Sequence, residues 1–157
     1  MHTVHHTRIV APLHVVFAIA RDVESWPDLL PQYRWCRVLE RGPERLTFSM
    51  GGWIRGWPAR WTAVQELRPG EHRITFRHIQ GITAGMQAEW RFTSAGGGVD
   101  VELVHEFVMR WPLIGRAVGD LIVGPVFIDW IARKTLQAVK RRAEATADSM
   151  KTGGARA

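Results

Sequence analysis

The feature that most constrains this sequence is a long stretch, from residue 33 to about residue 109, in which apolar and polar side chains alternate. Turns that contain Gly or Pro interrupt the alternation at intervals, as at Pro69-Gly70 and residues 96–98. The alternating segments are residues 45–50, 60–68, 72–78, 86–92 and 101–109. A period of two is typical of antiparallel strands with one buried and one solvated face. This stretch therefore predicts a meander of about six strands.

Before the meander, the sequence predicts one strand and two short helices. Residues 3–10 have the composition of a strand, and Ala11-Pro12 opens a helix because proline is tolerated in the first turn. We expect this helix to bury four apolar side chains. They are Val15, Val16, Ala18 and Ile19. A second short helix is predicted from about residue 23, and Pro31 ends it.

After the meander, the pattern becomes helical from Pro125 onward. Residues spaced three or four apart form one apolar stripe, as in an amphipathic helix. The stripe consists of Ile128, Ala132, Thr135, Leu136, Val139 and Ala143. Residues 111–124 fit a loop with a short helix, and the sequence does not decide between the alternatives there.

This order of elements predicts an α+β fold, in which a curved antiparallel sheet of about six or seven strands wraps a long C-terminal helix. Incomplete filling between the sheet and the helix would leave an internal apolar cavity. We expect a single ligand-binding domain over residues 1–147 and a flexible tail over residues 148–157, where small and polar residues lead into Gly153-Gly154.

The net charge of +6 raises the question of a polyanionic partner. Most of the basic excess lies in the last helix and the tail, which is typical of a solvated helix face, and no nucleic-acid motif accompanies it. We therefore expect no nucleic-acid partner, whereas a weak attraction to anionic membranes stays open. The single Cys36 forms no internal disulfide, and the N-terminal residues do not read as a secretory signal, so a cytoplasmic location is expected.

Three segments resemble bacterial aromatic polyketide cyclase/aromatase proteins. The run Asp22-Val23-Glu24-Ser25-Trp26-Pro27-Asp28-Leu29-Leu30-Pro31-Gln32-Tyr33 resembles their short-helix segment. Glu89-Trp90-Arg91-Phe92 and Val104-His105-Glu106-Phe107 resemble their last two strands. These proteins belong to the helix-grip group (the SRPBCC superfamily), which includes START lipid-transfer domains, birch-pollen-allergen-type proteins and coenzyme-Q-binding proteins. The similarity covers residues 3–143.

The resemblance implies a cavity lined by aromatic and a few polar groups, which folds and dehydrates a poly-β-ketone without a cofactor. Trp26, Tyr33, Trp61 and Trp90 match aromatic positions of that cavity. One departure is that an Arg expected on the strand beginning near Trp61 is absent, because Ala63 and Gln65 stand in this region. The alternative is a non-catalytic carrier of a lipid or isoprenoid quinone.

Three polar side chains fall on the predicted inward face: Gln65, His78 and His105. A buried polar group must find a partner in the protein or in a ligand. We expect His78 and His105, with pKa values near neutrality, to transfer protons, and Tyr33 to donate a hydrogen bond to a developing oxyanion.

The remaining predicted residues contact the ligand. They are Trp26, Trp61, Gln65, Phe76, Met86, Trp90 and Leu103. We expect no metal site and no cofactor, a hydrophobic small molecule as ligand, and a monomer or homodimer. The Gly-rich stretch 51–57 carries Trp53 and Trp57 and predicts a hairpin loop. Its tryptophans would gate the cavity, touch a membrane transiently, or fold back on the core.

Overall fold

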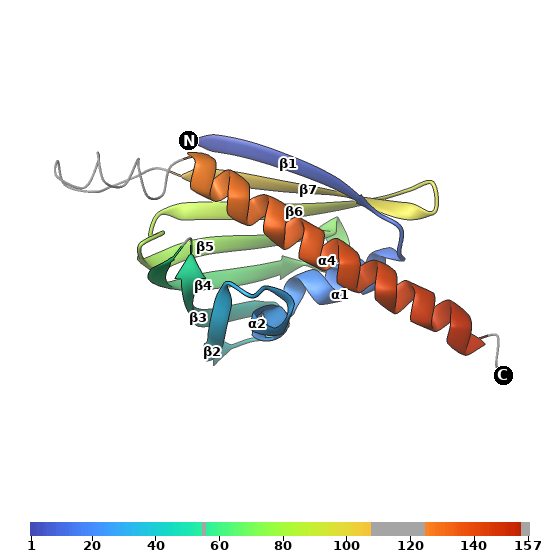
Figure 1. Cartoon of the computed structure of the whole chain (residues 1–157), viewed down its shortest axis with the longest axis horizontal. Helices are drawn as coiled ribbons and strands as arrows, with labels where there is room; N and C mark the ends of the chain where they lie inside the picture. Colours follow the sequence, from blue (N-terminus) through green and yellow to red (C-terminus); the bar gives the residue numbers. More distant parts are fainter. Residues whose placement is uncertain (55, 108–124, 155–157) are drawn as a thin grey trace.

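A curved seven-stranded antiparallel sheet grips one long helix in the computed structural model, which describes residues 1–54, 56–107 and 125–154 (Figure 1). The strands are β1 His2–Ile9, β2 Tyr33–Arg41, β3 Arg45–Ile54, β4 Trp57–Arg68, β5 Arg73–Gly81, β6 Met86–Ala95 and β7 Gly98–Phe107. The helices are α1 Leu13–Arg21, α2 Trp26–Leu29 and α4 Pro125–Gly154, with single 3-10 turns η1 Val23–Ser25 and η2 Pro69–Glu71. The predicted α+β class, strand number and two short helices are confirmed.

The sheet order β1-β7-β6-β5-β4-β3-β2 shows that successive strands from β2 to β7 pair as hairpins, while β1 adds to β7. The β3–β4 and β5–β6 turns therefore lie at one end of the sheet, and the β4–β5 and β6–β7 turns lie at the other. Helix α4 begins at the first of these ends and crosses the concave face diagonally (Figure 1).

Helix α1 closes the other end of the core, but with a different buried face from the one predicted. Val15 and Val16 are buried as expected, whereas Ala18 is exposed and Phe17 is buried instead. Ile19 is only half-buried. The Phe17 ring meets Phe92 of β6 edge-on at 5.4 Å, so this residue belongs to the face of the helix that packs on the sheet.

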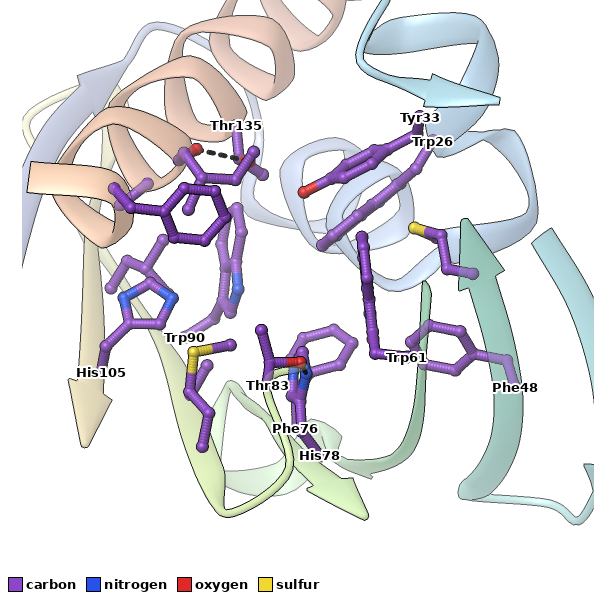
Figure 2. A pocket seen from close by; sticks show the side chains of 17 residues that line it. Trp26, Tyr33, Phe48, Trp61, Phe76, His78, Thr83, Trp90, His105 and Thr135 are labelled. Atoms are coloured by element: carbon purple, nitrogen blue, oxygen red, sulfur yellow. Dashed lines mark hydrogen bonds between the residues drawn. The ribbon is translucent and has the colours of Figure 1, made fainter. Parts of the chain in front are cut away.

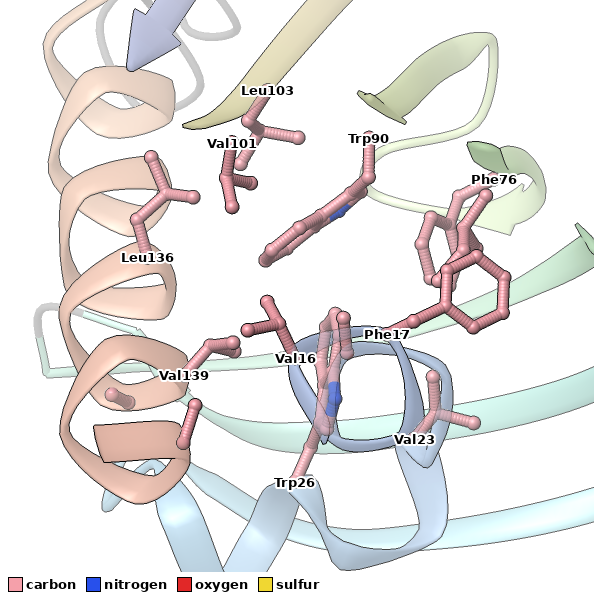
Figure 3. Packing of buried hydrophobic residues seen from close by; sticks show 14 of the residues in the cluster. Val16, Phe17, Val23, Trp26, Phe76, Trp90, Val101, Leu103, Leu136 and Val139 are labelled. Atoms are coloured by element: carbon pink, nitrogen blue, oxygen red, sulfur yellow. The ribbon is translucent and has the colours of Figure 1, made fainter. Parts of the chain in front are cut away.

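The core between the sheet, α1 and α4 centres on Trp90, which is 2% exposed (Figure 3). Val16 of α1 and the aliphatic side chains of α4 approach its indole (Figure 3). The whole predicted stripe of α4 is buried, from Ile128 to Ala143. Helical spacing on α4 and alternation on the strands thus supply two apolar faces that fit each other.

Helix α4 continues through Gly154, so the flexible tail predicted for residues 148–157 is helical as far as that residue. Ala147 is still 5% exposed, and the Thr146 hydroxyl donates to the Arg142 carbonyl oxygen at 2.8 Å. The polar residues that follow are compatible with a solvated helix, and no proline interrupts them. The strand end at Met109 and the loop or helix predicted for residues 111–124 lie outside the described residues. Among the described helices, none is long and apolar enough to cross a membrane.

Candidate functional site

A cavity of about 80 Å³ lies between the concave face of the sheet and the N-terminal half of α4 (Figure 2). Its walls come from α2, from strands β2 to β7 with the β5–β6 turn, and from α4. The lining residues are Trp26, Tyr33, Phe48, Met50, Trp61, Phe76, His78, Thr83, Met86, Ala88, Trp90, Leu103, His105, Phe127, Ile131, Ala132 and Thr135. Of the predicted site residues, only Gln65 is missing from this set.

Aromatic rings form two walls of the cavity. Trp26 stacks on Tyr33 with 6.1 Å between ring centroids and 16° between planes, and Tyr33 meets Trp61 edge-on at 5.6 Å. Trp61 in turn stacks on the His78 ring at 6.1 Å and 19°. Trp26 also lies 6.2 Å from Trp90. Such an array offers flat apolar surfaces to a planar molecule.

Gln65 faces inward but does not reach the cavity. Its Nε2 donates to the backbone carbonyl oxygen of Arg21 at 2.8 Å. The side chain is 2% exposed and lies beside the C-terminal end of α1, where a helix leaves carbonyl groups without intrahelical partners. The structure therefore places Gln65 as a cap for α1 rather than as a ligand-binding residue.

His78 is oriented by the β5–β6 turn. Its Nδ1 lies 2.6 Å from the Thr83 hydroxyl (Figure 2). Burial, with a smaller effect from His105 nearby, lowers the pKa of His78 from 6.5 to about 3. The near-neutral pKa expected for this residue is therefore wrong, because the apolar surroundings disfavour the imidazolium. A Thr83 hydroxyl that donates to Nδ1 leaves the ring proton on Nε2.

His105 of β7 lies on the neighbouring wall and is 7% exposed. Its Nδ1 has no hydrogen-bond partner among the described residues. Burial, and to a smaller extent His5, lowers the pKa of His105 from 6.5 to about 4. His5 itself bonds through Nε2 to the Asp129 carboxylate of α4 at 2.7 Å. His105 is thus held as an uncharged imidazole, and the near-neutral pKa expected for it is wrong as well.

Tyr33 contributes a phenol that stays protonated. Burial raises its pKa from 10.0 to about 12, while a hydrogen bond with the Thr135 side chain acts in the opposite direction. The Thr135 hydroxyl also donates to the Ile131 carbonyl oxygen at 2.8 Å. The Tyr33 hydroxyl from β2 and the Thr135 side chain from α4 thus line the same cavity (Figure 2).

The polar groups of the cavity are thus neutral at physiological pH. No Asp, Glu, Lys or Arg lines it among the residues that the structure describes. That part of the chain also contains no cluster of three His, Cys, Asp or Glu side chains suited to a metal ion. The arrangement can hold a planar molecule and polarise its carbonyl or hydroxyl oxygens by hydrogen bonding.

Sequence reasoning missed several lining residues. Phe48 and Met50 lie on the apolar face of the alternating segment 45–50, so the same alternation could have assigned them to the site. Thr83 lies in a turn, and no local pattern indicates its approach to His78. Phe127 and Thr135 come from α4, and their place depends on the angle at which that helix crosses the sheet.

The Gly-rich stretch forms a tighter hairpin than predicted, because β3 reaches Ile54 and β4 starts at Trp57, with these two residues paired. Trp53 is 51% exposed and Trp57 is 66% exposed. Neither indole is among the residues that line the cavity. The alternative in which this loop folds back on the core is therefore wrong.

Comparison with known proteins gives consistent results. The family model described as "Polyketide cyclase / dehydrase and lipid transport" matches residues 9–141. A candidate polyketide cyclase of Streptomyces cyaneus is 26% identical over 116 residues, which cover 69% of this chain and 74% of the relative. Another from Streptomyces halstedii is 28% identical over 113 residues, covering 70% and 96%. The crystal structure of Zhui, an aromatase/cyclase from a Streptomyces species, superposes with a TM-score of 0.84 at 22% identity over 92% of this chain and 93% of that one.

Proposed function

Because the chain belongs to the polyketide cyclase/dehydrase and lipid transport family, we propose that its cavity binds a polyketide-type molecule and promotes ring closure and loss of water. The observation that carries this proposal is the convergence of neutral hydrogen-bonding groups on a cavity walled by aromatic rings. Tyr33, His78 and His105 come from three different strands and line the same space.

The chemistry asks for orientation and carbonyl activation. In an aldol closure, a methylene carbon loses a proton and bonds to a ketone carbon, whose oxygen becomes a hydroxyl and later leaves as water. In our proposal the Tyr33 hydroxyl and the Nε2–H of His78 donate to the carbonyl oxygens, which acidifies the methylene between them. His105 lines the same space and accepts the proton through the ring nitrogen that carries no hydrogen. Its low pKa makes it a weak base, so most of the rate enhancement must come from orientation and donor placement.

The volume of the cavity adds a requirement. The described residues enclose about 80 Å³. Pockets for drug-sized ligands start at about 300 Å³. A polycyclic ligand therefore enters only if lining side chains move, and unbranched Met86 and the half-buried Phe127 are the ones we expect to rotate.

The test is turnover of a synthetic poly-β-ketone, followed by chromatography and mass spectrometry that separate spontaneous from enzyme-directed products. We expect the wild type to direct the product pattern and to accelerate loss of water. Tyr33→Phe should lose about a hundredfold in rate, the lower end of the range for removal of one oxyanion donor. His14→Gln on the exposed side of α1 is the matched control and should retain full activity. A wild type that leaves the spontaneous pattern unchanged would refute catalysis.

A second candidate is carriage of a hydrophobic molecule without chemistry. The observation that favours it is the absence of any ionised group from the described cavity lining. The Arg that the family resemblance implies near Trp61 is also absent, because Ala63 and Gln65 stand in that region. Such a carrier would bind its ligand and leave the covalent structure of the ligand unchanged. The same incubation distinguishes the two functions, because a carrier retains the ligand and releases it unaltered.

For either function, the lone Cys36 supports our proposal of a cytoplasmic location, which cell fractionation would test.

A further inference from the structure

An aromatic and basic surface covers the tip of the β3–β4 hairpin and the adjoining outer side of strands β2 to β4. We call it the Trp face and define it by Trp35, Trp53, Trp57 and Arg60. Its indoles are 40%, 51% and 66% exposed, in sequence order. Trp35 pairs with Gly51 of β3, so Trp53, two residues further along β3, lies on the same side of the sheet. Trp57 pairs with Ile54 at the tip itself and has the parity of Trp61, so Trp53 and Trp57 leave the tip on opposite sides of the hairpin. A gathering of large exposed apolar side chains is uncommon on a protein without a partner.

The Trp face is held in place by its neighbours. The Trp35 ring lies across Gly51, where a Cβ atom would come within 2.5 Å of the indole. Gly51 in turn pairs with Arg60, whose guanidinium carbon lies 6.0 Å from the Trp35 ring centroid. One indole therefore spans β3 and meets a cation on β4. The ring is ordered on the surface while it stays accessible.

The charge around the Trp face is positive and uncompensated. Arg34, Arg37 and Arg60 are exposed, and none of them has a carboxylate within 4.0 Å among the described residues. Strand β3 contains no Asp or Glu. The outer face of β5 to β7 differs, since two of its arginines are paired with glutamates, Arg73 with Glu89 at 3.5 Å and Arg91 with Glu102 at 2.7 Å. The surface around the Trp face thus complements an anionic one.

The Trp face also lies at the end of the sheet where the cavity is lined by the β5–β6 turn. Thr83 and Met86 line the cavity there, and α4 begins at the same end (Figure 1). Exposed Ile79 and Val126 lie on β5 and at the start of α4. A surface that contacts the hairpin tip would therefore face this end of the cavity.

We propose that the Trp face docks on an anionic lipid bilayer, with the indoles at headgroup depth and the arginines on lipid phosphates. Indole rings prefer the membrane–water interface because one edge donates a hydrogen bond and the rest is apolar. Arginines beside them gain from the negative surface potential of the bilayer. The docking brings the cavity to a hydrophobic reservoir. It does not depend on whether the cavity performs chemistry on its ligand.

The experiment is co-sedimentation of the full chain with vesicles of equal parts phosphatidylcholine and phosphatidylglycerol, compared with vesicles of phosphatidylcholine alone. We expect binding to the anionic vesicles that weakens with added salt. Trp53→Ser/Trp57→Ser should lower the partition coefficient about tenfold, and Arg37→Gln and Arg60→Gln about fivefold each. The matched control is Val10→Ser/Met150→Ser, which removes exposed apolar side chains at the opposite end and should leave binding unchanged. Circular dichroism verifies that each variant is folded.

Two results would overturn the proposal. Binding that survives the double Trp substitution and disappears in Arg141→Glu/Arg142→Glu would assign the contact to the basic part of α4. A wild-type protein that does not sediment with anionic vesicles would leave the Trp face to a protein partner of acidic character and exclude the bilayer.

Discussion

Acid should destabilise this protein through the two histidines of the cavity, and the effect can be worked out from their surroundings. Burial lowers the pKa of His78 to about 3 and of His105 to about 4, whereas an unfolded histidine has a pKa of about 6.5. The unfolded chain therefore binds more protons than the folded one below pH 6.5. Stability is fully present above that pH and is lost as the pH falls toward the folded pKa values.

The magnitude follows from the linkage relation. Well below pH 6.5, each neutral buried histidine lowers the free energy of unfolding by about 1.4 kcal/mol per pH unit. Between pH 6.5 and about pH 5, where the protonation of the unfolded state is incomplete at first, the loss is about 1.5 kcal/mol for each residue. The two histidines together should therefore contribute about 3 kcal/mol over this interval, which is a large part of the stability of a small domain.

The assay is urea unfolding at several pH values between neutrality and about pH 5, for the wild type and for His78→Gln/His105→Gln. The variant should lose less stability on acidification than the wild type, by about 3 kcal/mol. His14→Gln, an exposed histidine of α1, is the matched control and should keep the wild-type profile. Parallel profiles for wild type and double variant would refute the reasoning, since they would mean that neither imidazole is held neutral by the fold.

Three further substitutions test the packing. Gln65→Ala should lower the free energy of unfolding by about 1–3 kcal/mol, because it leaves the Arg21 carbonyl oxygen without its partner; ligand affinity, measured by titration, should not change. Gly51→Ala should cost about 1–3 kcal/mol and shift Trp fluorescence, since the new methyl group displaces the Trp35 ring. Trp90→Ala should cost about 3–5 kcal/mol in urea unfolding, as a fully buried ring at the centre of the core is lost. Wild-type stability in any of these variants would contradict the corresponding contact.

The helix-grip fold could be predicted because its main signals are local. Alternation along β4 to β7 places Trp61, Phe76, Trp90 and Leu103 on one face, and the structure confirms that they are buried. Helical spacing identifies the stripe of α4 in the same way. These patterns depend only on the period of the backbone, so they can be recognised in the sequence without knowledge of tertiary contacts.

The candidate site was predictable only in part, because contacts between distant segments decide which inward residues meet. Gln65 lies on the inward face of β4, but its side chain donates a hydrogen bond to the carbonyl oxygen of Arg21 at the end of α1. These two residues are 44 positions apart in the sequence. Thr83 enters the site through a turn that no pattern indicates. The pKa values of His78 and His105 depend on how completely the core excludes water, and a sequence reports residue types rather than burial depth.

The most direct test of the proposed role is to identify what the cavity holds. Freshly purified protein would be examined by native mass spectrometry, and any bound molecule would be extracted and identified. We predict a polycyclic aromatic of polyketide type, either co-purified or bound when added and reported by quenching of the cavity tryptophans. An isoprenoid quinone or acyl lipid in the cavity, with no affinity for such aromatics, would contradict the cyclase function and establish a carrier.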